Sequence, residues 1–243
     1  MGRRGAAVDG RAASRFDFTR QGATSGAEVG KWPGMTGLFE RHKERLEKAV
    51  ATCGTRGYWS AFPEAPSGKV YGATAAADGQ AAFEARLDRP FGLGQPATEE
   101  RVGAEVSPYG FPLGITYPAP DIAGMIEAAE AATPGWRAAE AEGRAGVCLE
   151  ILDRLNKRSF ELAHAVMHTS GQGFVMAFQA GGPHAQDRAL EALALSYAAM
   201  GRVPARALWE KPAGRDRVER FEKRYAIAGR GVGLVIGCST FPT

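Results

Sequence analysis

Apolar residues recur at a helical spacing of three to four positions in five stretches of the chain. In the first stretch Phe39, Leu46 and Val50 fall on one face, and Gly54 follows as a stop. The other four stretches lie after residue 119 and show the same one-sided pattern. The pattern therefore predicts helices over 36–53, 121–134, 141–156, 159–170 and 184–200.

The period of the pattern changes from helix to strand after residue 201. Between Phe221 and Ile227 large side chains alternate with charged or small ones, which predicts a half-exposed strand. A glycine-rich turn at 229–231 then precedes a continuous apolar run over 232–237. A run of this kind predicts a strand buried on both faces of a parallel sheet.

Two glycine-rich and proline-rich stretches carry no sustained period. Residues 55–118 also contain many aromatic side chains, and we expect ordered loop with short strands there. Residues 171–183 are expected to form a connection between two helices.

The composition is that of a soluble globular protein. The 243 residues allow one or two domains, 44% of them are hydrophobic, and no window approaches eighteen apolar residues. The net charge of +3 comes from residues 1–34, which hold six basic and three acidic residues, so the remaining 24 basic and 24 acidic residues balance. A neutral body gives no electrostatic reason to expect nucleic acid or a membrane as partner.

Residues 1–34 and the cysteines complete this picture. The first 34 residues are rich in glycine, alanine and arginine, and we expect either a disordered tail or an over-extended start, with Met35 as the true start. Cys53, Cys148 and Cys238 are too few and too far apart for a disulfide framework or a zinc cluster. A reducing cytoplasm is the simplest setting for such a chain.

Two motifs with possible ligand chemistry fail on spacing. Gly229, Gly231 and Gly233 precede a predicted strand, whereas a dinucleotide fingerprint follows a strand and opens a helix. Glu161 and His164 form a single E-x-x-H, but a di-iron bundle needs two such motifs, so we predict a polar helix face and no metal site.

The remaining candidates are single residues or short stretches. Cys53 and Cys148 fall on apolar helix faces and are predicted core residues, whereas Cys238 follows a predicted buried strand, at the edge where open α/β sheets bind ligands. The polar stretch 167–173 ends a helix, a common place for function, although its spacing assigns no reaction. For Trp136, Arg137 and Arg144 we expect structural roles, as a buried aromatic residue or as helix caps.

The order of these pieces resembles the N-terminal part of the aldehyde dehydrogenase superfamily. There, G-V-x-x-x-I runs into an N-F-P loop, and here Gly231–Ile236 is followed by Gly-Cys-Ser-Thr-Phe-Pro242. Over about 36–243 the chain is similar to the PaaN type, which acts in phenylacetate degradation. The stretches that carry this resemblance are Thr55–Ser60, Val106–Gly110, Arg144–Glu150, Ala177–Arg188 and Trp209–Pro212.

The resemblance implies aldehyde oxidation with NAD or NADP as cofactor. In the family a cysteine thiolate attacks the aldehyde, hydride passes to the cofactor, and a glutamate-activated water releases the acid. That cysteine and glutamate lie downstream of the N-F-P loop, so no cysteine of this chain takes the nucleophile's role. The implied cofactor-binding residues are Ile236, Gly237, Cys238 and Ser239.

One site residue departs from the family pattern. Thr240 stands where the family usually has the asparagine whose amide stabilises the oxyanion, so the implied catalytic role falls to a hydroxyl of shorter reach. The implied substrate is a small-molecule aldehyde, for instance a CoA-linked semialdehyde from ring-opened phenylacetyl-CoA. The complete protein is expected to be a homo-oligomer.

We therefore expect an α/β protein, the N-terminal part of the aldehyde dehydrogenase fold. The region present should be mostly helical, with a β-hairpin and the first buried strand of the cofactor-binding sheet. Residues 35–118 are a family-specific segment, and 119–243 an incomplete portion of the cofactor-binding and oligomerisation domain. The alternative is a non-catalytic helical scaffold or oligomerisation module of the same ancestry.

Overall fold

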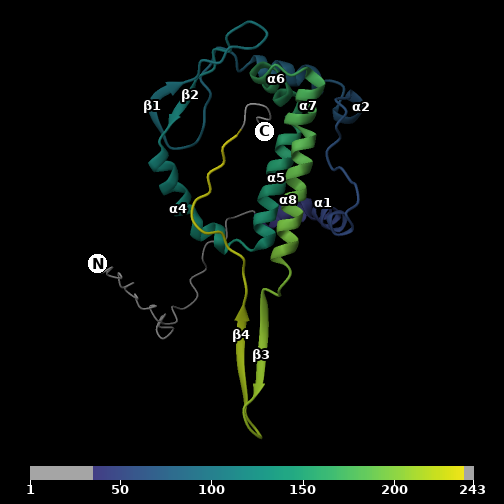
Figure 1. The fold of residues 1–243 in the computed structure, drawn as a ribbon, viewed down its shortest axis with the longest axis vertical. Helices are drawn as coiled ribbons and strands as arrows, with labels where there is room; N and C mark the ends of the chain where they lie inside the picture. The colour runs from purple at the N-terminus through teal and green to yellow at the C-terminus, as the bar shows by residue number, and fades with distance from the viewer. Residues whose placement is uncertain (1–34, 238–243) are drawn as a thin grey trace, which may run out of the picture.

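A computed structural model describes residues 35–237 (Figure 1). Helices dominate this part of the chain, and the strands form two separate antiparallel pairs, β1 with β2 and β3 with β4. The elements are α1 (Met35–Thr55), α2 (Gly68–Tyr71), α3 (Ala75–Glu84), β1 (Ala97–Val102), β2 (Tyr117–Pro120), α4 (Ile122–Ala138), α5 (Ala141–Asn156), α6 (Ser159–Ser170), α7 (Phe174–Gly181), α8 (Pro183–Met200), β3 (Arg206–Pro212) and β4 (Val218–Arg224).

The main core lies where α1 crosses α5 and α8. Gly146 lets the helices approach closely, since a Cβ built there would lie 2.6 Å from the backbone nitrogen of Phe39. The one-sided apolar pattern of the sequence supplies the side chains that fill this crossing. The buried cluster consists of Phe39, Leu46, Ala49, Phe62, Ala145, Leu149, Leu152, Leu190 and Ala194.

Two smaller cores surround α6. On one side Phe160 and Ala163 pack with Phe178 of α7, and on the other Phe83 of α3 packs with Leu113 of the following loop. At Gly79 the close approach of α3 to α6 leaves no room for a Cβ, which would lie 2.3 Å from that of Phe160. The region that precedes residue 119 is therefore fixed to α6.

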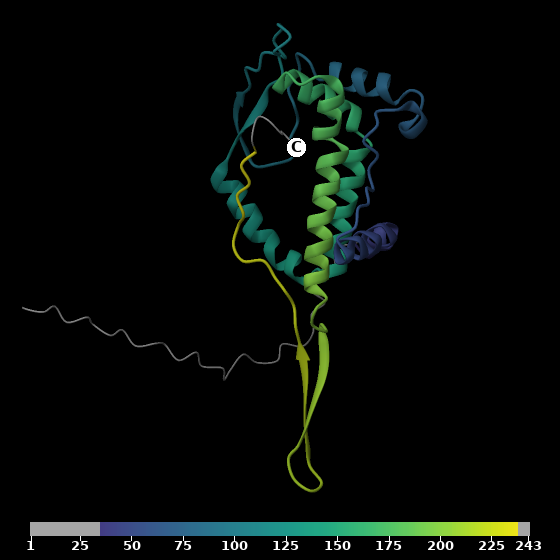
Figure 2. The ribbon, with the colours of Figure 1, turned by 45° about the vertical axis from the view of Figure 1, so that its right-hand side comes forward.

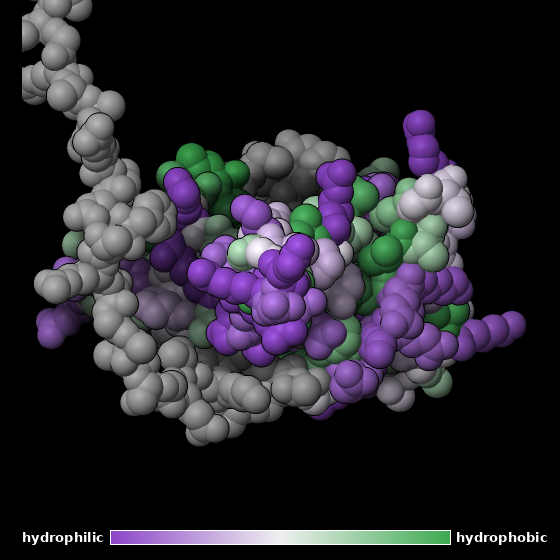
Figure 3. Space-filling model, turned by 90° about the horizontal axis from the view of Figure 1, so that it is seen from below, coloured by the Kyte–Doolittle hydropathy of each residue, from purple (hydrophilic) through white to green (hydrophobic). Residues whose placement is uncertain are grey.

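The β3–β4 hairpin projects from the body as a long arm (Figures 1 and 2). Its strands pair in simple register, with Trp209 opposite Phe221, and its side chains are almost all exposed. Figure 3 views the molecule from the hairpin end, and hydrophilic residues dominate the nearest atoms. A strand is therefore present where one was predicted, but it spans 218–224 and both its faces are exposed, so the prediction of a half-exposed strand over 221–227 is right only in part.

All five predicted helices are present, and two run further than predicted. Helix α1 continues through Gly54, its predicted stop, to Thr55. Asp121 caps α4, because its carboxylate accepts a hydrogen bond from the backbone N–H of Gly124. The helix continues past Pro134 to Ala138, although proline was expected to end it. Pro134 is exposed, so water can reach the carbonyl whose helical bond the proline removes.

Three predictions about the connections and strands are wrong. Residues 55–118 contain α2 and α3 besides short strands, and 171–183 contains α7, whose glycines stand at its ends as caps. The run over 232–237 forms no strand, and its side chains are exposed. A strand needs a neighbour to take its backbone hydrogen bonds, and none of the described residues pairs with this run. No helix within 35–237 is both long and apolar enough to cross a bilayer.

Candidate functional site

The segment expected to approach the cofactor lies in the open. Residues 225–237 run beside α4 in both ribbon views, and Arg137 of that helix donates a hydrogen bond to the carbonyl of Gly229 at 3.0 Å. Ile236 is 84% exposed and Gly237 is also exposed. Cys238, Ser239 and Thr240 lie outside the described residues.

The E-x-x-H face is occupied by ion pairs and ring stacking. The Glu161 carboxylate accepts hydrogen bonds from Arg158 and Arg86, and the bond from Arg158 lowers the pKa of Glu161. His164 and His168 stack on Phe83, and burial lowers the pKa of both imidazoles. Within 35–237 no group of three histidine, cysteine or acidic side chains is placed to hold a metal ion.

The polar stretch 167–173 is tied to the loop that precedes β2. His168 Nδ1 lies 2.9 Å from the hydroxyl of Ser107, which is buried, and the Tyr109 hydroxyl donates to the carbonyl of Gln172 at 3.0 Å. These contacts give the stretch a structural role.

The candidate single residues also take structural positions. Cys53 is half-buried against the main core, and burial raises the pKa of the half-buried Cys148 thiol. Trp136 is half-buried, and Arg144 donates to the sulfur of Met200 at 3.2 Å.

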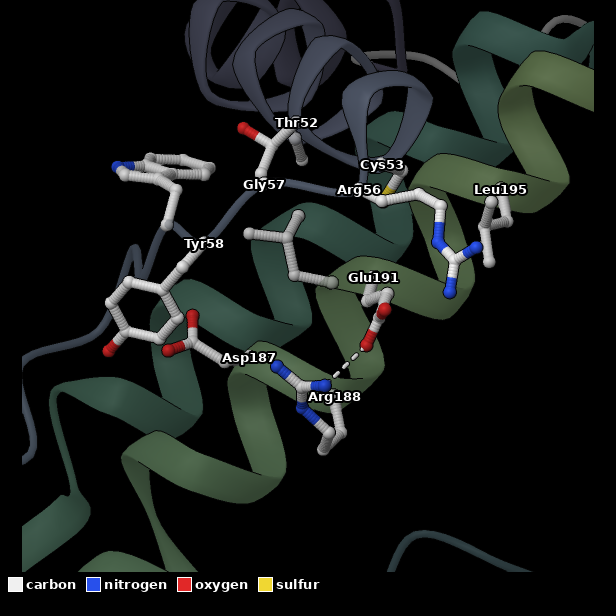
Figure 4. Close-up of a pocket in the computed structure, with 12 residues that line it drawn as sticks. Thr52, Cys53, Arg56, Gly57, Tyr58, Asp187, Arg188, Glu191 and Leu195 are labelled. Carbon is white, nitrogen blue, oxygen red and sulfur yellow. Dashed lines mark hydrogen bonds and ion pairs between the residues drawn. The ribbon is translucent and has the colours of Figure 1, made fainter.

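A pocket lies where two stretches of the family resemblance meet, between the end of α1 and the side of α8. Asp187 of α8 accepts hydrogen bonds from the hydroxyl of Ser60 and from the backbone N–H of Ala61, at 2.5 and 2.9 Å. Asp187 is 9% exposed, so these bonds fix the loop 56–61 to the helix. The cavity between them has a volume of about 410 Å³ (Figure 4).

The walls of this pocket differ in character. Ala49 and Leu190, both buried, line it together with the half-buried Cys53. Figure 4 shows Tyr58 on one side and Arg56 with Leu195 on the other. Hydrophobic periodicity carries no signal for this pocket, because Ser60 and Asp187, which join its two sides, lie 127 positions apart and only the folded α1–α8 contact brings them together. The resemblance stretches Thr55–Ser60 and Ala177–Arg188 mark its two halves.

Comparison with solved structures finds one strong similarity. A crystal structure titled as an NAD-dependent aldehyde dehydrogenase from Burkholderia multivorans shares 55% sequence identity with this chain, with a TM-score of 0.81. The similarity covers 85% of this chain and 37% of that one, so this chain spans a little over a third of its length. No protein-family model and no curated protein matches the chain. The similarity supports the aldehyde dehydrogenase superfamily and confirms the expected fold class, a mostly helical N-terminal part of that fold.

Proposed function

We propose that this chain is the N-terminal part of an NAD(P)-dependent aldehyde dehydrogenase. The observation that carries the proposal is the 55% identity to an enzyme of that description, combined with a TM-score of 0.81 over 85% of the chain. Identity at this level over a shared fold favours a shared reaction, although a fold alone does not specify one.

Uncovered apolar surface supports the assignment to part of a larger fold. Within 35–237, α4 has no buried residue, and Ile122, Met125 and Ile126 on it are exposed. Leu234 and Val235 of the run after the hairpin are 85% and 93% exposed. Large aliphatic side chains gain free energy when buried, so surfaces of this kind suit contact with further sheet and helix.

We assign the cofactor and oxyanion roles to the end of this run. Ile236 and Gly237 stand in exposed backbone that a cofactor can approach, and Gly237 has no side chain to obstruct it. They form no enclosing site among the described residues, so we assign them contact and no chemical step. NAD or NADP, when bound, supplies the hydride acceptor. The Thr240 hydroxyl donates to the developing oxyanion, and Cys238 and Ser239 complete the cofactor contact.

Three finer assignments concern the metabolic pathway, the cellular location and the oligomeric state. We infer an aldehyde substrate of phenylacetate catabolism, a CoA-linked semialdehyde included, and a cytoplasmic setting. We also infer a homo-oligomer joined through the β3–β4 arm, whose exposed Leu208 and Phe221 suit contact with another subunit. The second candidate, a non-catalytic helical scaffold or oligomerisation module of the same ancestry, rests on the same projecting arm.

The proposal is tested by assaying the purified chain with NAD⁺, NADP⁺ and a panel of aldehydes. We expect no protein-dependent rise in the absorbance of reduced cofactor, because the family's reacting cysteine and glutamate belong downstream of Thr240. Turnover that disappears in Cys238→Ala would contradict the proposal and make Cys238 the nucleophile. Turnover that survives Cys238→Ala would contradict it as well, by showing that chemistry does not need the downstream residues.

A further inference from the structure

We propose that the pocket between α1 and α8 binds a small aromatic carboxylate. The ligand's carboxylate lies on the guanidinium of Arg56, and its flat body covers the aliphatic wall, in which Leu195 is 55% exposed. The volume of about 410 Å³ falls within the range typical of small-molecule sites. This site is separate from the cofactor contact assigned above.

The backbone at Arg56 is the first observation that supports this site. Arg56 has φ +55°, a left-handed conformation that suits glycine and is unfavourable for arginine. Arg56 is the left-handed residue that follows the last residue of α1, and its side chain lines the pocket. The turn that holds it is closed by hydrogen bonds from the N–H groups of Arg56 and Gly57 to the carbonyls of Cys53 and Thr52. These bonds satisfy two carbonyls of the last helical turn, as at many helix C-termini.

The second observation is the balance of charge in the pocket. The lining contains two arginines, one aspartate and one glutamate. Arg188 donates a hydrogen bond to Glu191 at 2.6 Å, and the Asp187 carboxylate accepts hydrogen bonds from Ser60 and Ala61. The Arg56 guanidinium makes no hydrogen bond or ion pair with the described residues and points between Leu195 and Glu191 (Figure 4). The four charges sum to zero, but the Arg56 guanidinium is the charged group of the lining that no described residue pairs. A guanidinium binds a carboxylate with two parallel hydrogen bonds.

The third observation is the aromatic side of the pocket. Tyr58 is 89% exposed although it lies at the pocket's edge, which leaves its ring available to stack on a ligand. Trp59 is half-buried beside it, with the Lys48 ammonium 4.6 Å from its ring centre. A flat aromatic body gains contact with both these rings and the aliphatic wall, whereas an alkyl chain does not stack.

The experiment measures binding of 2-naphthoate to the full chain by calorimetry. Its neutral isostere 2-naphthamide and its cationic relative 2-naphthylmethylamine serve as matched ligands. Arg56→Gly and Arg56→Asn remove the guanidinium while keeping residues that accept a left-handed backbone. Arg89→Gln, an exposed arginine outside the pocket lining, is the matched charge control. Alkylation of Cys53, followed by mass spectrometry with Cys148 as internal reference, locates the ligand.

We expect saturable binding of naphthoate that slows alkylation at Cys53 more than at Cys148. Either Arg56 substitution should weaken binding at least about tenfold, the scale of a lost charge-assisted bond, and Arg89→Gln should leave it unchanged. Three results would overturn the proposal. These are equal affinity for the acid and the amide, tighter binding of the amine, and wild-type affinity in folded Arg56→Gly and Arg56→Asn. The absence of saturable binding would overturn it too.

Discussion

Replacing Gly146 by alanine should destabilise the protein, even though alanine favours helices. A Cβ at this position would lie 2.6 Å from the nitrogen and 3.0 Å from the Cα of Phe39, and both are backbone atoms of α1. Because no flexible side chain can move aside, α1 must retreat by close to 1 Å, which forfeits about a quarter to a half of the dispersion energy of affected contacts.

The magnitude follows from two opposing effects. Removing a helical glycine gains up to about 1 kcal/mol, whereas overpacking a fitted helix contact costs about 1–3 kcal/mol. We expect a net loss of about 1–2 kcal/mol and a melting temperature lower by roughly 2–8 °C for a chain of this size. Gly54→Ala is the matched control, since Gly54 also lies in a helix and a Cβ there meets nothing within 4 Å.

The assay is thermal and urea unfolding followed by circular dichroism. Gly54→Ala should leave the melting temperature unchanged or raise it slightly. If Gly146→Ala raised the melting temperature as much as the control, the close crossing of α1 and α5 would be refuted.

Three further predictions concern charge, hydrogen bonding and solubility. The hydrogen bond with His42 is the largest of the effects that lower the pKa of Glu150 from 4.5 to about 2. The ionised Glu150 carboxylate therefore stabilises the fold fully above pH 4.5, and this stabilisation is lost as the pH falls through 2. Glu150→Gln should therefore cost more stability in urea titrations at about pH 5.5 than at about pH 3, and equal costs would contradict this. Asp187→Ala should destabilise the protein by about 2–3 kcal/mol in urea unfolding, because it leaves the half-buried donors of Ser60 and Ala61 unpaired, and Asp187→Asn by less. Ser60→Ala should cost only about 1 kcal/mol, and a reversed order would refute the described bonds. Leu234→Lys should reduce aggregation measured by light scattering, because Leu234 is 85% exposed, and a monodisperse wild-type chain would contradict the expectation.

The sequence predicts those elements whose side chains face a core formed nearby. In α5, Leu149 and Leu152 recur at helical spacing and are buried as that spacing requires. The short α7 escapes prediction because glycines at both ends give it the composition of a linker.

The run over 232–237 shows the opposite error. The apolar composition of this run indicates that it needs a buried environment. Whether the run forms a strand depends on neighbouring strands that pair with it. Leu234 is 85% exposed because no strand among residues 35–237 pairs with this run.

Hydrophobic periodicity cannot predict the pocket at Arg56, for a related reason. Its aspartate meets Ser60 across 127 positions of sequence, and only the packing of α1 on α8 brings the two together. The left-handed backbone of Arg56 was also unexpected, since sequence patterns assign such conformations to glycine or asparagine.

A chimera tests the central proposal most directly. Residues 35–243 replace the matched segment of the Burkholderia multivorans aldehyde dehydrogenase, and aldehyde-dependent NAD⁺ reduction is measured beside the parent and beside the parent lacking that segment. At 55% identity we predict a folded chimera that retains turnover, while the truncated parent has none. A chimera that folds and melts like the parent but reduces no NAD⁺ would contradict the assignment of this chain to an aldehyde dehydrogenase.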